Sequence, residues 1–130
     1  MEKRIIITLP RYDDTTEYLS QWSYKIEEIA NDKDVKIKKL LDEEANKDEF
    51  EKVIKKLNYK IIIFNGHGSS NSICGNNGGA IVTLGVNEYL LRDRITYARA
   101  CDAAITLGNE CVKDNNGVFI GYIVPLCILY

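Results

Sequence analysis

The feature of this sequence that most constrains its fold is the apolar run Tyr59–Phe64. A strand with one wet face alternates apolar and polar residues, and this run does not alternate. Such a run indicates burial on both faces, which is typical of a central strand in a parallel sheet. It therefore predicts a sheet with helices packed on both of its faces.

Other segments have the composition of strands. Arg4–Leu9 is rich in isoleucine and is followed by Pro10, which predicts a first strand. Val35–Lys38 alternates apolar residues with lysines, a pattern typical of an edge strand that lysines protect from pairing with other chains. Two short apolar runs around Asn76–Gly79 predict a β-hairpin. Further strands are predicted at Ile95–Ala100 and Val118–Val124.

Helical patterns lie between these strands. Asp14 followed by Glu17 has the form of an N-cap, and apolar residues follow it at helical spacing. Asn46 is the predicted cap of a second helix, and Asp102–Val112 is a third predicted helix. The apolar positions of the first two helices are Tyr18, Leu19, Trp22, Ile26 and Ile29, then Phe50, Val53, Ile54 and Leu57.

The alternation of strands and helices predicts one α/β domain over residues 1–130. Right-handed crossovers and an edge-like second strand favour a mostly parallel sheet of order 2-1-3-4-5, with the hairpin after strand 3 counted separately. The predicted architecture is a three-layer α/β/α sandwich.

Composition excludes several classes of function. The chain has 130 residues, a formal net charge of −2 and charges of both signs interleaved, so no basic footprint for nucleic acid is expected. No segment has the length of a membrane span or the form of a signal peptide, which favours a cytoplasmic protein. With one histidine and no C-x-x-C pair, we expect neither a metal site nor a cofactor.

The histidine is the first candidate for chemistry. His67 lies in Asn65-Gly66-His67-Gly68, directly after the central strand, and Cys101 ends the strand predicted at Ile95–Ala100. Functional residues gather at the carboxyl ends of parallel strands, so an imidazole is expected beside a thiol. A histidine beside a cysteine forms the simplest catalytic dyad in which a thiolate acts as nucleophile. If a helix begins at Cys101, its N-terminus also favours the thiolate.

Backbone groups near the pair complete this interpretation. The N–H groups of Gly68 and Cys101 are candidates for an oxyanion hole, which stabilises a tetrahedral intermediate by roughly 3 kcal/mol per donor. Glycine at position 68 lets a substrate carbonyl approach the backbone.

The succession of strand, His-Gly, hairpin, helix, strand and Ala-Cys resembles the caspase-like cysteine peptidases. This superfamily includes caspases, metacaspases, clostripain-like and gingipain-like peptidases, separases and CHAT domains. The matching segments are Asn65–Gly68, Arg99-Ala100-Cys101-Asp102 and Gly117–Tyr122. The resemblance implies a cysteine endopeptidase with His67 as base, Cys101 as nucleophile, Gly68 as oxyanion donor and a protein or peptide as substrate.

The resemblance leaves the pocket and the partner open. Arg99 occupies a position that often lines the substrate pocket, which favours an acidic side chain before the cut, whereas a pocket formed by Asp102 predicts the opposite. Many members of the family carry glycine or serine shortly after the cysteine, whereas Asp102-Ala103-Ala104 follows it here. The family domain usually continues to a sixth strand. By the same resemblance the chain is either a fragment truncated before that strand, a piece like the family's large subunit, or a minimal form whose cleft a second copy or a partner chain completes.

Each candidate residue has a simpler interpretation as well. His67 would then bond a loop carbonyl, and Cys101 would be a small buried residue. The whole chain would be a catalytically silent binding or regulatory module of the same fold. A third alternative is a flavodoxin-like binder of a small molecule, with a polar cleft at the first and third strands.

Overall fold

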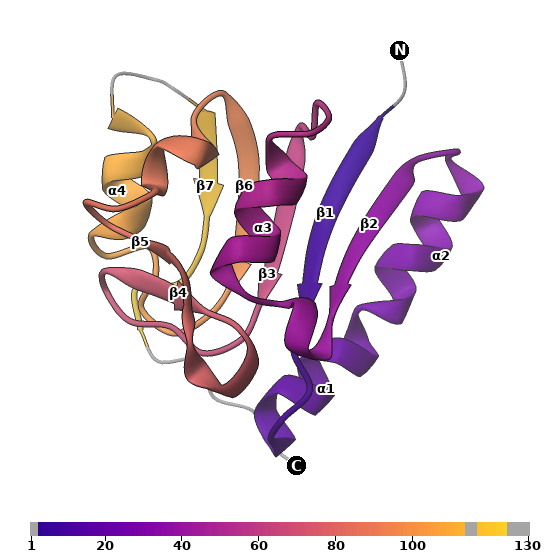
Figure 1. The fold of residues 1–130 in the computed structure, drawn as a ribbon, viewed down its shortest axis with the longest axis horizontal. Helices are drawn as coiled ribbons and strands as arrows, with labels where there is room; N and C mark the ends of the chain where they lie inside the picture. The colour runs from indigo at the N-terminus through magenta and orange to yellow at the C-terminus, as the bar shows by residue number, and fades with distance from the viewer. Residues whose placement is uncertain (1–2, 114–116, 125–130) are drawn as a thin grey trace.

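The computed structural model describes residues 3–113 and 117–124, and within them a five-stranded sheet forms the centre of the molecule. All its strand pairs are parallel, and its order is β2-β1-β3-β6-β7 (Figure 1). The strands are β1 (Arg4–Leu9), β2 (Lys36–Leu41), β3 (Ile61–Asn65), β6 (Arg94–Arg99) and β7 (Gly117–Ile120).

The remaining elements connect these strands. The hairpin β4 (Ser72–Cys74) and β5 (Ala80–Thr83) is antiparallel and separate from the large sheet. The helices are α1 (Asp14–Trp22), α2 (Tyr24–Asp32), α3 (Lys47–Ile54) and α4 (Leu107–Cys111), with short 3-10 helices η1 (Asp42–Glu44), η2 (Asn76–Gly78) and η3 (Glu88–Leu91).

The predicted α/β class, the mostly parallel sheet and the small hairpin are confirmed. The predicted order counted only strands of the large sheet, and β6 and β7 are the fourth and fifth of these in the chain. No helix among the described residues has both the length and the apolar composition needed to cross a membrane.

One face of the sheet, here called the α3 face, carries the main core. Even-numbered strand residues such as Ile6, Ile62 and Phe64 are fully buried there against α3, the hairpin and α4. Phe64 packs on Phe50 of α3 with ring centroids 5.3 Å apart. Figure 1 shows α3 in front of the sheet on this side.

The opposite face, here called the α2 face, has a smaller core. Odd-numbered residues Ile7, Leu9 and Ile63 are buried there, with Ile26 of α2 packed against them. Helices cover β6 and β7 only in part on this face, because Ile95 is 42% exposed and the β7 residues Val118 and Ile120 are 50% and 52% exposed. The sheet is therefore covered well on one face and only in part on the other.

The predicted helix Asp102–Val112 is wrong in its first half. Residues 101–106 form turns, and α4 begins only at Leu107. Asp102 has a left-handed φ of 57°, and its N–H donates to the carbonyl of Val124 at 3.3 Å. Since Ala104 N–H likewise donates to Tyr122 O at 3.0 Å, the turn is held by the chain after β7.

Candidate active site

His67 and Cys101 follow neighbouring strands at the same edge of the sheet. β3 pairs with β6 in parallel, and the last residues in register are Asn65 and Arg99. His67 and Cys101 each lie two residues beyond that pair, and Gly66 N–H still donates to Arg99 O at 3.3 Å. Both side chains are half-buried. The structure therefore places the candidate base and nucleophile on adjacent loops.

Gly68 forms the contact between these two loops. A methyl group added at its Cα would lie 2.8 Å from both Ala100 Cβ and Cys101 O, and 3.3 Å from Cys101 N. Two of these distances are shorter than real Cβ contacts, so only glycine fits here without displacing the Cys101 backbone. The glycine at this position thus sets how close the two loops come.

The N–H of Gly68 is left out of the adjacent bridge to Ile73. The two hydrogen bonds of that bridge are donated by Ser69, to Ser72 O at 2.9 Å, and by Cys74, to His67 O at 2.8 Å. The bridge fixes the loop after His67, while the Gly68 amide takes no part in it. This geometry suits an oxyanion donor.

The cysteine lacks one expected feature. Because α4 begins at Leu107, Cys101 does not stand at a helix N-terminus, and the helix dipole does not act on its thiol as predicted. Its loop is held instead by Val124 and Tyr122, and by Leu107 N–H donating to Ser70 O at 2.9 Å.

Asp13 is a site residue that the sequence interpretation missed. Its Oδ2 lies 2.6 Å from Nε2 of His67, with the two side chains 38% and 41% exposed. Its Oδ1 accepts hydrogen bonds from Thr16 N at 2.9 Å and Thr16 Oγ1 at 2.7 Å. One carboxylate oxygen therefore caps α1 and the other holds the imidazole.

Asp13 was not predicted as a site residue because the start of α1 was expected one residue later. Asp14 was expected to be the N-cap, whereas the N-cap is Asp13, and Thr16 completes the capping box. A signal was available in the predicted strand order. With strand 1 next to strand 3, an acid in the loop after Arg4–Leu9 comes to the same edge as His67.

Hydrogen bonds keep Asp13 ionised. Partial burial alone would raise its pKa, but donation from Thr16 N–H, His67 and the Thr16 hydroxyl outweighs burial and lowers the pKa. An ionised carboxylate only accepts, so Nε2 of His67 carries the proton in this pair. When the ring is neutral, Nδ1 is then the nitrogen with an available lone pair.

Tyr12 lies near the imidazole of His67. Its ring centroid is 6.1 Å from that of His67, and the planes are tilted by 58°. Burial, and then the charge of Asp13, raise the pKa of Tyr12, so it stays neutral at physiological pH. It contributes an apolar wall to His67.

Arg99, which was predicted to line the substrate pocket, is held by hydrogen bonds to β3 and to the α1–α2 junction. Its Nε donates to Asn65 Oδ1 at 2.6 Å, and its Nη2 donates to Ser23 Oγ at 2.5 Å and to Leu19 O at 3.2 Å. Burial lowers the pKa of Arg99, although Tyr97 and Tyr122 oppose this. The guanidinium therefore joins the α1–α2 junction to the sheet.

Asp102 remains beside Cys101 as the other candidate pocket residue. It is half-buried, and its left-handed backbone directs the chain into the turn toward Val124. Aspartate tolerates this conformation better than most residues do.

The other described thiols differ from Cys101 in their surroundings. Cys111 is buried in the main core, and burial raises its pKa to about 12, so its thiolate is not accessible near neutral pH. Cys74 belongs to the hairpin strand β4 and is half-buried, and Cys127 lies outside the described residues. Cys74, Cys101 and Cys111 are thiols and not disulfides.

Within residues 3–113 and 117–124, no group of three or more His, Cys, Asp or Glu side chains is arranged to hold a metal ion. Comparison of the chain with protein-family models, curated proteins and solved structures found no match.

Proposed function

We propose that this chain is a cysteine peptidase of caspase-like architecture, a three-layer α/β/α sandwich with its site at the carboxyl ends of β3 and β6. The observation that carries the proposal is the 2.6 Å contact between Asp13 and a histidine whose loop packs on the backbone of Cys101. A carboxylate that orients an imidazole beside a nucleophile is the arrangement used in hydrolytic triads.

In the proposed mechanism, Nδ1 of His67 takes the thiol proton and the Cys101 thiolate attacks the scissile carbonyl carbon. The oxyanion of the tetrahedral intermediate accepts hydrogen bonds from Gly68 N–H and Cys101 N–H. His67 returns the proton to the leaving amine as the C–N bond breaks and the acyl-enzyme forms. Water then attacks the thioester with His67 as base, which releases the acid and the thiol.

Ionised Asp13 contributes by fixing the ring. It holds the proton on Nε2 and stabilises the imidazolium that forms during both proton transfers. Since Arg99 is engaged elsewhere, the ionisable residue next to the nucleophile is Asp102. A basic side chain before the cut is the specificity that this carboxylate favours.

Thiol reactivity tests the proposal directly. With iodoacetamide near neutral pH, Cys101 should be alkylated faster than Cys74, Cys111 and Cys127, and His67→Ala should slow only Cys101. Hydrolysis of reporter peptides should fall by roughly 100-fold or more in the same variant, the usual loss when a general base is removed. Cys101→Ser serves as the inactive control.

Equal reactivity of all four thiols would contradict the peptidase and favour the silent binding module. Fast alkylation of Cys101 without hydrolysis of any peptide in a library would leave a reactive thiol but no peptidase.

A further inference from the structure

The α2 face carries an unbroken apolar row across the whole sheet. Register places Ile37, Ile5, Ile61, Ile95 and Val118 side by side on β2, β1, β3, β6 and β7. The β2 and β1 end is covered by α2, whereas Ile95 is 42% and Val118 50% exposed at the other end. The uncovered part is therefore continuous with the core under α2.

The direction of the crossovers explains why this part is bare. Only the connection from β1 to β2 runs toward that edge of the sheet, and it places α1 and α2 on the α2 face. The later connections, to β3, β6 and β7, all run the opposite way and contribute their buried residues to the core of the α3 face. Right-handed crossovers require this sidedness.

The bare area has the width of one helix. From β3 to β7 there are two inter-strand spacings, or about 10 Å. An α-helix with its side chains is about 10 Å wide. A single helix lying beside α2 would therefore cover Ile61, Ile95 and Val118 together.

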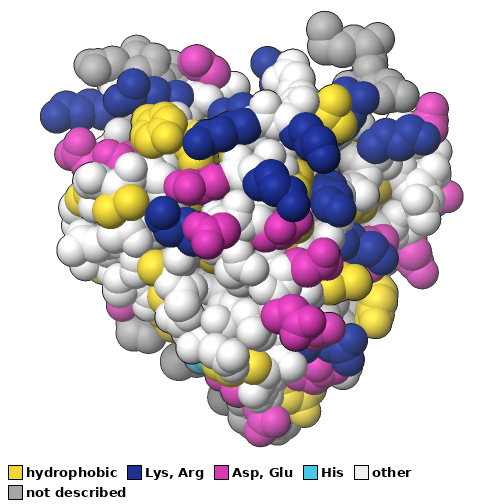
Figure 2. Space-filling view, viewed as in Figure 1, with side chains coloured by type: hydrophobic (Ala, Val, Ile, Leu, Met, Phe, Trp, Pro, Cys, Tyr) yellow, Lys and Arg dark blue, Asp and Glu magenta, His cyan; other side chains and the backbone are white. Residues whose placement is uncertain are grey.

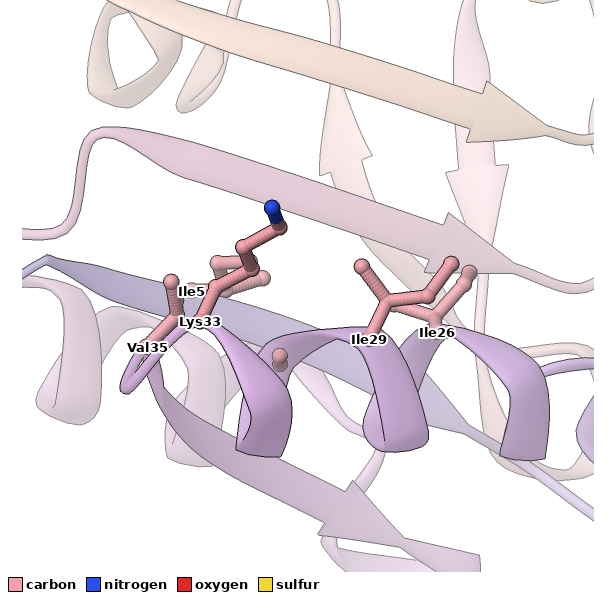
Figure 3. Close-up of a pocket in the computed structure, with 6 residues that line it drawn as sticks. Ile5, Ile26, Ile29, Lys33 and Val35 are labelled. Carbon is pink, nitrogen blue, oxygen red and sulfur yellow. The ribbon is translucent and has the colours of Figure 1, made fainter.

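Two adjoining hollows show where such a helix would seat. One, of about 170 Å³, is bounded by Ile26 and Ile29 of α2, and Figure 3 shows these side chains projecting from the same side of the helix as Lys33. The other, of about 290 Å³, has Ile61 and Ile95 on its floor. Ile5 and Val35 line both hollows, so the two adjoin each other. Together with the bare area over β6 and β7, they are called the groove below.

Every ionisable side chain that lines the two hollows is basic: Lys3, Arg4, Lys33 and Lys60. They lie at or beyond the amino-terminal ends of β1 and β3 and at the end of α2. Figure 2 views the opposite, α3 face, where Lys and Arg gather over the amino-terminal ends of the strands and mostly acidic side chains lie at the lower end; the groove itself is not visible in this view. The groove is thus apolar along its length and positive at one end.

We infer that this groove binds an amphipathic helix of a partner polypeptide, with an apolar stripe and acidic residues at one end. A second copy of this chain fits less well, because a two-fold contact would bring the same basic rim against itself. A small anionic ligand would fill only the hollows and leave Val118 and Ile120, each at least half exposed, uncovered. This inference does not depend on Cys101 chemistry.

Binding of a matched pair of peptides tests the inference. Each has about 15 residues, the length at which isolated helices begin to be stable, and the same apolar stripe. One carries glutamates at one end and the other lysines. Fluorescence polarisation should show tighter binding of the acidic peptide, with affinity falling as salt rises.

Variants locate the binding surface. Val118→Glu places a charge in the apolar contact and should weaken binding at least about tenfold. Val86→Glu, at a residue 56% exposed in the loop after β5, is the matched control and should change nothing. Lys3→Glu with Lys60→Glu should reverse the preference between the peptides. Thermal melts of each variant establish that it is folded.

Three outcomes would overturn the inference: no binding of either peptide, equal binding of both, or loss of binding in Val86→Glu as large as in Val118→Glu. Vesicles of phosphatidylcholine and phosphatidylserine provide another arm. Sedimentation with these vesicles that Val118→Glu abolishes, without peptide binding, would assign the groove to a lipid surface instead.

Discussion

Asp13 and His67 are joined by a 2.6 Å contact that depends on how α1 begins. The carboxylate that meets Nε2 of His67 also accepts the N–H of Thr16 in the first turn of the helix. The orientation of the imidazole and the capping of the helix therefore share one side chain. A substitution at position 13 can change the orientation of the imidazole, the capping of α1, or both, depending on which residue replaces the aspartate.

Asp13→Asn should separate the two roles. Asparagine caps a helix about as well as aspartate, so the free energy of unfolding should change little. The amide cannot stabilise an imidazolium, so the alkylation rate of Cys101 and any peptide hydrolysis should fall. Asp13→Ala should show the same loss of reactivity and, in addition, about 1 kcal/mol lower stability in urea. Unchanged Cys101 reactivity in both variants would remove Asp13 from the site.

The lowered pKa of Asp13 predicts how stability depends on pH. A carboxyl whose pKa is lower in the folded than in the unfolded state contributes stability above its unfolded pKa, near 3.9. That contribution is lost as the pH falls through the folded pKa. Wild type should therefore lose stability below about pH 4 more steeply than Asp13→Asn does. Urea midpoints measured between neutral and acid pH test this, and parallel curves would contradict it.

Gly68→Ala should disturb the loop of the nucleophile. The added methyl group would meet Ala100 Cβ and Cys101 O at 2.8 Å, and relieving such overlap costs about 1–3 kcal/mol. Stability and Cys101 reactivity should both fall. Gly79→Ala is the control, because its methyl group would meet only Asn76 O, at 3.6 Å. Equal effects of the two variants would show that close packing at Gly68 is not special.

Arg99→Met should act on stability and not on substrate choice. Its removal leaves Asn65 Oδ1 and the Ser23 hydroxyl without the guanidinium, and a buried group without its partner costs about 1–3 kcal/mol. If the folded variant is active, its relative rates on peptides with acidic and basic side chains should match those of wild type. A selective loss of acidic substrates would restore Arg99 to the pocket.

Periodicity predicted the sheet because burial on both faces leaves a direct mark on composition, as in the run that became β3. The same approach found the cap at Asn46, where an amide precedes a clear apolar stripe. The helix predicted to begin at Asp102 was wrong. A turn forms there instead, held by the carbonyls of Tyr122 and Val124, and no local pattern in the sequence reveals such distant contacts.

For the candidate site, too, local sequence predicted the positions of residues but not their distant contacts. Position at strand ends was enough to predict that His67 and Cys101 lie on neighbouring loops. It could not reveal which way Arg99 turns, because its partners Ser23 and Leu19 lie more than seventy residues away. Asp13 was hidden by one residue of ambiguity in the start of a helix.

Helix α1 is attached to the candidate site at both of its ends. Its cap, Asp13, holds His67, and its last turn and the residue after it, Leu19 O and Ser23, hold Arg99 two positions before Cys101. Local opening of this nine-residue helix would release the base and loosen the nucleophile strand in a single event, while the core on the α3 face stayed intact. The fraction of molecules able to react would then follow the local stability of α1, not the global stability of the domain. Amide hydrogen exchange in α1 is the observable that reports it.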